Sequence, residues 1–339
     1  MRITTRCLLH PNLVVFHKQD LLRSIVLNAT STKSVEDTSS ITENLSTDTI
    51  GMSSPKRFVN NSLKRKKSLT APQWVKLNVE YNSSYGTPLP KEMTKANEFF
   101  NKAKVEFEWG VTSFDSILSE IVRKKLKVRD DGNQISKNGT KKFVGKTNIP
   151  FKLINGLPEI TFLGRSNAGK SSMLNNLLTQ LGCRKLTDEA RMSSRPGFTK
   201  TLNCFNIGNK FRLIDTPGYG FGSKFDQGSL TMKYIENREE LVRCFVLIPA
   251  NQGFTNLDLQ ILNYLKGIGK PFEVVFTKMD KVKDINILKR QIEDSGIIDY
   301  ATLPKLLFTN SMTSKNCPKR YGITELRHTI MQSCNMLVN

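Results

Sequence analysis

Short apolar runs alternate with amphipathic stretches through the second half of this chain. Six runs rich in Ile, Leu, Val and Phe have the length of buried strands, at residues 160–163, 202–207, 211–214, 244–248, 272–276 and 306–308. Five stretches with helical spacing lie among them, at residues 170–181, 230–242, 256–268, 285–295 and 323–336. Because alternating strands and helices build a parallel sheet covered on both faces, this pattern predicts an α/β domain.

Residues 202–214 depart from this alternation. Two strand-like runs are separated there only by a tight Gly208-Asn209 turn, which is typical of an antiparallel hairpin. We therefore expect a six-stranded, mostly parallel sheet with one antiparallel edge strand, within a domain that spans residues 151–339.

Residues 88–150 form a basic segment with helical periodicity. One apolar stripe at helical spacing predicts an amphipathic helix that packs on the next domain: Met93, Ala96, Phe100, Ala103 and Phe107. A second helix is predicted over residues 114–128, and it ends in a cluster of cations: Arg123, Lys124, Lys125, Lys127 and Arg129. This cluster, with Lys141, Lys142 and Lys146, is a candidate RNA surface, and a solvated helix face is the alternative.

The first 87 residues lack the pattern of a folded domain. Residues 1–35 hold five basic side chains against the single acid Asp20, interleaved with short apolar clusters. This profile is typical of a mitochondrial transit peptide, although a disordered basic terminus is the alternative. Residues 36–87 are rich in Ser, Thr, Asn and charge, and we expect a disordered linker there.

Charge and hydropathy narrow the functional classes. The 339 residues include 51 Lys and Arg against 30 Asp and Glu, a formal net charge of +21. Residues 1–72 account for only 11 of the basic and 5 of the acidic side chains, so most of the excess belongs to the rest of the chain. General basicity favours a phosphate-rich partner. No apolar stretch approaches the roughly 18 residues that a membrane span needs.

A phosphate-binding loop follows the run 160–163 and opens the helix 170–181. It reads Gly164-Arg165-Ser166-Asn167-Ala168-Gly169-Lys170-Ser171, a G-x-x-x-x-G-K-S motif. The two glycines let backbone amides turn towards phosphate oxygens, and the start of the helix adds its positive dipole end. We expect Lys170 to reach the β- and γ-phosphates and Ser171 to ligate Mg²⁺; a chance glycine-rich turn is the alternative.

Three further motifs indicate a site for guanine and for the γ-phosphate. Asp215-Thr216-Pro217-Gly218 ends the second hairpin strand, where its carboxylate would lie near Mg²⁺ and its glycine amide near the γ-phosphate. Thr277-Lys278-Met279-Asp280 ends the run 272–276, and Asp280 can accept both guanine N1–H and its amino group. Adenine lacks that donor pair, which disfavours ATP. Thr309-Asn310-Ser311 is placed to touch guanine O6, with an ordinary turn as the alternative.

Residues 193–201 form a polar segment with Pro196 and Gly197 and no clear periodicity. In a GTP switch such a segment supplies a threonine to Mg²⁺ and the γ-phosphate only while GTP is bound. Thr199 is our candidate, whereas Thr201 begins a strand and is expected to be structural.

These motifs together resemble the EngB (YihA/YsxC) family within the TrmE-Era-EngA-EngB-septin-like group of GTPases. The resemblance rests on G-R-S-N-x-G-K-S-S at 164–172, P-G-F-T at 196–199, D-T-P-G-Y-G at 215–220 and T-K-M-D at 277–280, and covers about residues 155–339. It implies a Ras-like G domain that binds GTP or GDP and Mg²⁺, with Ser172 and Gly197 at the nucleotide. It also implies a role in maturation of the large ribosomal subunit. With the basic N-terminus, the chain resembles a fungal-type mitochondrial member acting in the matrix, expected to be monomeric.

The chain also departs from the family pattern. Phe198 stands where the family usually has Arg, residues 249–251 replace an Asp-x-Arg-His motif, and Asn310 replaces a Ser. Tyr219 occupies the place where Ras-type enzymes keep the water-orienting Gln, so we expect slow intrinsic hydrolysis. Asn167 resembles a P-loop asparagine that ligates K⁺ in related GTPases, and K⁺ or a ribosomal partner is expected to supply the missing stabilisation.

Two other classes remain as alternatives. A membrane-associated or signalling GTPase could turn its basic face to anionic lipid, but neither an amphipathic basic helix with aromatic anchors nor a lipidation motif is evident. A metabolic P-loop kinase is disfavoured by the guanine motif at 277–280.

Overall fold

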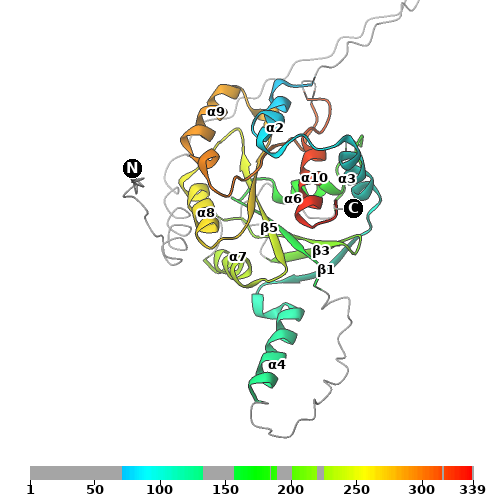
Figure 1. Ribbon diagram of the computed structural model, residues 1–339, viewed down its shortest axis with the longest axis vertical. Helices are drawn as coiled ribbons and strands as arrows, with labels where there is room; N and C mark the ends of the chain where they lie inside the picture. Colours follow the sequence, from blue (N-terminus) through cyan, green and yellow to red (C-terminus); the bar gives the residue numbers. More distant parts are fainter. Residues whose placement is uncertain are drawn as a thin grey trace, which may run out of the picture.

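The computed structural model describes residues 71–132, 156–183, 185–188, 201–219, 225–314 and 317–337. Within these residues seven strands form one sheet in the order β1-β3-β4-β2-β5-β6-β7 (Figure 1). The predicted transit peptide at 1–35 and the switch segment up to residue 200 lie outside the described residues.

All six predicted strands are present, and their pairing confirms a mostly parallel sheet. Their bounds are β2 Glu159–Gly164, β3 Leu202–Ile207, β4 Phe211–Asp215, β5 Leu241–Pro249, β6 Phe272–Thr277 and β7 Leu306–Phe308. The strands β4, β2, β5, β6 and β7 are parallel, and β3 pairs with β4 as the expected hairpin. Gly208 and Asn209 have φ of 58° and 53°, as a type I′ turn requires.

Helices cover both faces of the sheet (Figure 1). On one face lie α3 (Pro90–Lys102), α6 (Lys170–Leu178) and α10 (Ile323–Ser333), which share one buried apolar cluster with β2 and β4. On the other lie α7 (Phe225–Asn237), α8 (Asn256–Gly267) and α9 (Ile285–Asp294), which share a second cluster. This two-sided burial explains why the central strands are apolar at nearly every position.

A seventh strand corrects the prediction of six. The helix expected to run to Phe107 ends at Lys102, and β1 (Val105–Val111) follows and pairs antiparallel with β3. The prediction of a helix up to Phe107 was wrong because Phe107 belongs to this strand. Phe107 is 61% exposed there, and its ring contacts Phe205 with centroids 5.7 Å apart. The sheet therefore has two antiparallel pairings, β1 with β3 and β3 with β4, and only β3 runs opposite to the other strands. The edge is formed by β1, not by the predicted antiparallel strand β3.

The predicted linker also needs correction. Residues 73–85, within the range 36–87, form the short α2 helix (Leu77–Glu80) between two 3₁₀ turns. Trp74 and Leu77 are 5% and 2% exposed in the core, and the Trp74 ring packs edge-on against Tyr321. Two apolar anchors therefore order a segment whose average composition is polar.

Two asparagine side chains of this segment seal the free edge of β7. The Asn78 carboxamide donates to Phe308 O at 3.0 Å and accepts from Phe308 N at 2.9 Å. The Asn82 carboxamide donates to Leu306 O at 2.7 Å and accepts from Leu306 N at 3.0 Å. Asn78 lies in α2, and Asn82 lies two residues beyond its end. The two side chains bond to alternate residues of β7, as a neighbouring strand would.

Buried ion pairs join the predicted helical extension to the sheet. Glu108 of β1 accepts from Arg212 of β4 at 2.6 Å. Glu120 of α4 (Leu118–Gly132) accepts from Arg238 at 2.6 Å, and Arg238 also reaches Glu159 of β2 at 2.5 Å. Acids of β1 and of the start of α4 therefore neutralise charges in the core of the sheet.

Two cations of the candidate RNA cluster, Arg123 and Lys124, are paired with acids of the chain. Arg123 contacts Glu120 and Glu240, the latter at 2.7 Å, and Lys124 contacts Asp115. The side chains of Lys127 and Arg129 lie outside the described residues. Arg123 therefore ties α4 to the body, which favours a structural role over contact with RNA.

Candidate nucleotide site

The carboxyl ends of β2, β4, β6 and β7 carry the predicted motifs. These parallel strands end at the same edge of the sheet, so they bring together residues more than 100 positions apart in sequence, as in other open α/β sheets. The P-loop touches both the turn that follows D-T-P and the T-K-M-D motif.

The P-loop leaves β2 at Gly164 and enters α6 at Lys170. Asn167 has φ 65° and Gly169 has φ 97°, so the loop turns twice through the left-handed region before the helix begins. A Cβ at Gly164 would lie 2.9 Å from Leu247 O, so no larger residue fits there without a shift. Ala168 is fully buried, and its amide bonds to Arg165 O at 3.0 Å. The result is a loop at a helix N-terminus, suited to an anion.

Lys170 lies buried beneath this loop. Its Nζ donates to Gly164 O at 3.0 Å and to Arg165 O at 3.2 Å. Burial lowers the pKa of Lys170 to about 8, although the nearby Asp215 carboxylate acts in the opposite direction. A phosphate at the loop would offer this ammonium group stronger, charged acceptors than two carbonyls.

Ser171 and Asp215 form an oxygen pair that fits a Mg²⁺ ion. Ser171 Oγ donates to Asp215 Oδ2 at 3.0 Å, and Asp215 Oδ1 is buried without a hydrogen-bond partner among the described residues. Burial raises the pKa of Asp215, while Lys170 and the Ser171 hydroxyl lower it. Hydroxyl and carboxylate oxygens are the ligands that Mg²⁺ prefers, so these residues suit the ion. Gly197 and Thr199, the other predicted contacts, lie outside the described residues.

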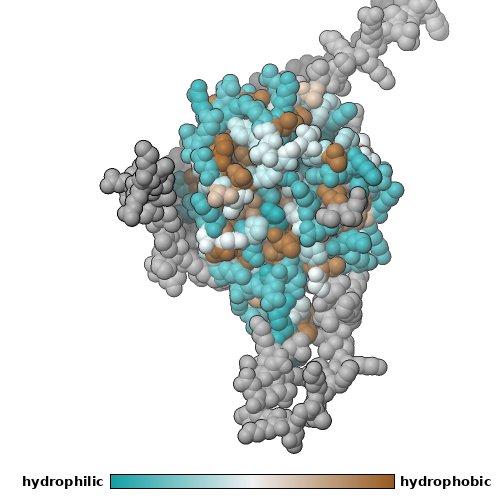
Figure 2. Space-filling view, in the orientation of Figure 1, coloured by the Kyte–Doolittle hydropathy of each residue, from teal (hydrophilic) through white to brown (hydrophobic). Residues whose placement is uncertain are grey.

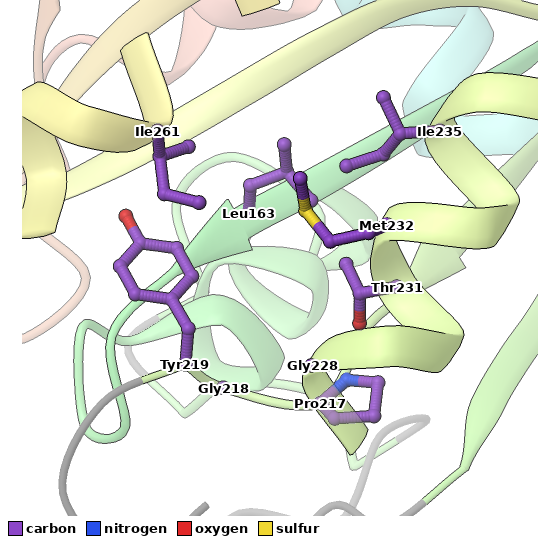
Figure 3. Close-up of a pocket in the computed structure, with 9 residues that line it drawn as sticks. All are labelled: Leu163, Pro217, Gly218, Tyr219, Gly228, Thr231, Met232, Ile235 and Ile261. Carbon is purple, nitrogen blue, oxygen red and sulfur yellow. The ribbon is translucent and has the colours of Figure 1, made fainter. Parts of the chain in front are cut away.

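Gly218 lies against the P-loop. A Cβ at this position would meet Ser166 N at 2.8 Å and Lys170 Nζ at 3.0 Å. The neighbouring Thr216 is buried and donates to Phe162 O at 2.6 Å, which gives it a structural role. Pro217 lines a small apolar pocket beneath the turn (Figure 3). Only Gly218 of the motif therefore approaches the phosphate region so closely that it must lack a side chain.

Tyr219 points away from the P-loop and towards α8. In Figure 3 its ring extends to Ile261, and its hydroxyl donates to Asp258 Oδ1 at 3.1 Å. Arg165 Nε lies 3.1 Å from the other oxygen of Asp258. Burial, reinforced by Asp258, raises the pKa of Tyr219 well above its usual value. The phenol therefore joins the D-T-P-G turn to the P-loop through Asp258.

Asp258 is a residue that sequence reasoning missed. It also forms a capping box with Thr255, whose amide bonds to Asp258 Oδ2 at 2.9 Å. The T-x-x-D spacing before an apolar helix is a visible capping signal, but it does not reveal the contacts with Arg165 and Tyr219.

The T-K-M-D motif closes over the P-loop. Thr277 donates to Ala168 O at 2.8 Å, and Lys278, with φ 57°, donates to Asn167 O at 2.7 Å. Met279 is buried and its amide bonds to Thr309 O at 3.2 Å. Asp280 is partly exposed in the short helix Met279–Lys281. This arrangement leaves a carboxylate accessible beside the loop, as guanine recognition requires.

Thr309, Asn310 and Ser311 follow β7 in the same region, but their polar atoms are engaged. The Asn310 carboxamide donates to Met312 O and Lys319 O at 2.8 and 2.9 Å, and it accepts from Tyr321 N at 2.7 Å. Asn176 of α6 donates to Ser311 Oγ at 3.0 Å. Asn310 therefore shapes its own loop, and its side chain is not placed to contact a base.

The remaining predicted contacts are Ser166 and Ser172. Ser166 N bonds to Tyr219 O at 3.0 Å, while Ser166 Oγ is buried with no partner in the described part of the chain. Ser172 is partly exposed in the first turn of α6. Ser166 belongs to the loop itself, and Ser172 lies in the helix that follows it.

Comparisons with known proteins agree with this geometry. Residues 159–278 match a family model described as a 50S ribosome-binding GTPase. The chain is 45% identical over 284 residues to MIOREX complex component 8 of Saccharomyces cerevisiae (strain ATCC 204508 / S288c), which covers 84% of this chain and 87% of that protein. It is 37% identical over 187 residues to a probable GTP-binding protein EngB of Caulobacter vibrioides, covering 52% of this chain and 76% of the relative.

Among solved structures, a probable GTP-binding protein EngB aligns with 52% of this chain and 98% of its own, at 19% identity and a TM-score of 0.39. The sequence relatives cover most of their own lengths at well over 30% identity. Together with the P-loop and the D-T-P-G and T-K-M-D motifs at the ends of β2, β4 and β6, they show that this chain belongs to the EngB family of GTPases.

Proposed function

We propose that this protein is a GTP-dependent switch that hydrolyses GTP slowly and acts in assembly of the large subunit of the mitochondrial ribosome. The observation that carries the nucleotide part is the contact of P-loop, Gly218 and T-K-M-D motif at one edge of the sheet. The ribosomal part is supported by the family description and by the net charge of +21. The mitochondrial matrix is supported by the acid-poor residues 1–35.

Each of the motif residues would have a distinct role in this switch. Lys170 would exchange its two carbonyl partners for phosphate oxygens, and the Gly218 amide would bind the γ-phosphate. Ser171 and Asp215, with Thr199, would hold Mg²⁺, which neutralises charge between the β- and γ-phosphates. Asp280 would accept from guanine. GTP would order residues 193–201 and the turn after Gly218, and the ordered form would bind the ribosome.

Slow hydrolysis follows from the direction of Tyr219. Its hydroxyl bonds to Asp258 and its ring contacts α8, so it has no geometry to orient a water molecule at the γ-phosphate. Asn167, at the turn of the P-loop, is our candidate for K⁺. Turnover should rise when K⁺ replaces Na⁺ or when large-subunit particles are added. Equal turnover under all these conditions contradicts this part of the proposal.

The test of the whole proposal is sedimentation of mitochondrial extract on a sucrose gradient. With a non-hydrolysable GTP analogue the protein should comigrate with a large-subunit species, and with GDP it should remain near the top. If the protein comigrates in neither state, the ribosomal role is wrong.

The affinity for GTP should exceed the affinity for ATP by at least about 100-fold, because ATP leaves Asp280 unpaired.

The described residues offer no helix long and apolar enough to cross a bilayer. Figure 2 shows hydrophilic residues over most of the visible face, with hydrophobic residues in small, separated patches.

A further inference from the structure

A basic groove lies between α3, α10 and the β3–β4 turn, with a volume of about 810 Å³. Its rim carries four lysines, and its walls include aromatic and thioether side chains. We define it by Lys95, Lys102, Lys104, Lys210, Phe99 and Met331.

This basic groove is separate from the nucleotide site. Pro158, which precedes β2, and Lys210, which precedes β4, both line it. The parallel strands β2 and β4 run from these residues to the P-loop and to Asp215, at the opposite edge of the sheet. A ligand in the basic groove would therefore leave the GTP site open.

The charge of the basic groove is not cancelled by its surroundings. Lys95, Lys102 and Lys210 are exposed and make no ion pair within the described parts of the chain. Lys104 is 2.9 Å from Glu106, but its side chain is 82% exposed. Glu98 is the one acid among the residues that line the groove. This contrasts with Arg123 and Lys124 on α4, whose charges are paired with acids of the chain.

The floor of the basic groove offers a rigid aromatic ring. Phe99 is partly exposed, and its ring centroid lies 5.5 Å from that of Phe100 and 6.1 Å from that of Phe211. The Gly208 turn fixes the ring further, since a Cβ at Gly208 would lie 3.2 Å from it. Exposed lysines around an aromatic surface are the elements of single-strand nucleic-acid sites, where phosphates meet the cations and a base stacks on the ring.

We infer that this basic groove binds a single-stranded segment of RNA, an inference that rests on the proposed ribosomal function. An acidic protein segment could meet the lysines, but it would make no use of the aromatic floor. RNA uses both.

Fluorescence anisotropy with a labelled single-stranded RNA of about 12 nucleotides tests this inference, using the full chain over a range of salt concentrations. In Lys102→Ala/Lys210→Ala the magnitude of the negative slope of log K against log salt should decrease by about 1.4, because each lost phosphate contact contributes about 0.7. Phe99→Leu, which keeps an apolar filler, should weaken binding about fivefold or more at unchanged slope.

The matched control is Lys76→Ala/Arg290→Ala, which removes two exposed cations outside the groove. It should leave the slope unchanged, and all variants should bind GDP as the wild type does. If the groove variants and the control variant lose equal RNA affinity, the groove is not the RNA site, and RNA binding is due to the general positive charge of the chain. If poly-glutamate displaces the labelled RNA as strongly as unlabelled RNA does, the inference of an RNA ligand is wrong and an acidic protein is the better candidate.

A third result would also overturn the RNA inference. If the chain binds no RNA but comigrates with the large subunit in the presence of the GTP analogue, its contact there is with protein. The groove then fails while the proposed ribosomal function stands. Failure of comigration together with loss of RNA binding only in the groove variants would instead retain the groove and remove the ribosomal role.

Discussion

Gly218 shows how a single missing side chain can set the geometry of the nucleotide site. Its α-carbon faces the backbone of Ser166 and the ammonium group of Lys170, and a methyl group there would meet both within about 3 Å. A backbone atom cannot yield as a flexible side chain can. The turn after β4 and the P-loop can therefore approach one another only because residue 218 is glycine.

Gly218→Ala should therefore weaken binding of a non-hydrolysable GTP analogue by at least about tenfold, which corresponds to about 1.4 kcal/mol. The affinity for GDP should change less. The γ-phosphate is the group that needs the Gly218 amide beside Lys170. Isothermal titration with both nucleotides measures the difference. Gly267→Ala is the control, because a Cβ at Gly267 meets nothing within 4 Å. Equal losses for the analogue and GDP would argue against the γ-phosphate role.

Tyr219 provides a second test at this scale. Tyr219→Phe removes the hydrogen bond to Asp258 and leaves the ring against α8. We expect the free energy of unfolding to fall by about 1 kcal/mol, because a buried acceptor loses a partner, while the GTP turnover number stays within about twofold. Urea unfolding and single-turnover hydrolysis measure the two quantities. A tenfold loss of turnover at unchanged GTP affinity would mean that the hydroxyl acts in the reaction.

Asn78 and Asn82 act at the level of an element, because together they take the place of a strand beside β7. A free strand edge presents unpaired N–H and C=O groups that can pair with another chain. Their carboxamides satisfy both groups of Leu306 and of Phe308. The short helix α2 thus closes the sheet without extending it.

Asn78→Ala should lower the free energy of unfolding by about 1–3 kcal/mol, because it leaves the Phe308 amide and carbonyl unpaired in a buried place. Hydrogen exchange should accelerate in β7 and stay slow in β2 and β5. Asn78→Ala/Asn82→Ala should also self-associate as concentration rises, visible by sedimentation velocity. Asn237→Ala, at an exposed helical site, is the control. Uniform acceleration over all strands would indicate a global effect and not an edge effect.

The elements that could be predicted from sequence are those whose signal is local. The strand β2 and the P-loop follow from an apolar run and a motif that occupy adjacent residues. The strand β1 could not be predicted in this way, since Ala103 and Phe107 continue the helical stripe of α3, and only pairing with β3 makes residues 105–111 a strand. The Asn78 contact joins residues 230 positions apart, and no local pattern carries it.

At the scale of the whole molecule, the packed core extends beyond the part of the chain that carries the motifs. The motifs and the resemblance begin at about residue 155, yet Trp74, Glu108 and Glu120 are buried in contact with that part of the chain. The site residues can be proposed from the sequence because phosphate and guanine chemistry constrains their types and spacing. The start of the domain carries no such signal, because burial of ordinary residues follows from tertiary contacts alone.

Two truncated chains separate these boundaries. A chain that begins at residue 71 keeps every described contact and should bind GDP as the full chain does. A chain that begins at residue 151 loses β1, exposing the edge of β3, and leaves Arg212 and Arg238 without Glu108 and Glu120. Arg238 keeps Glu159, but breaking the buried Glu108–Arg212 pair costs about 3–5 kcal/mol, and whole domains have only about 5–15 kcal/mol of stability.

The shorter chain should therefore fail to unfold cooperatively in a thermal scan followed by circular dichroism, and it should not bind fluorescent GDP. Its basic groove would be lost too, since Phe99 and three of the four rim lysines belong to residues 95–104. Cooperative unfolding of the shorter chain with wild-type GDP affinity would place the start of the domain at residue 151, and β1 and α2 would then be dispensable. We expect the opposite, because Glu108 of β1 and Glu120 of α4 neutralise arginines that would remain buried in the shorter chain.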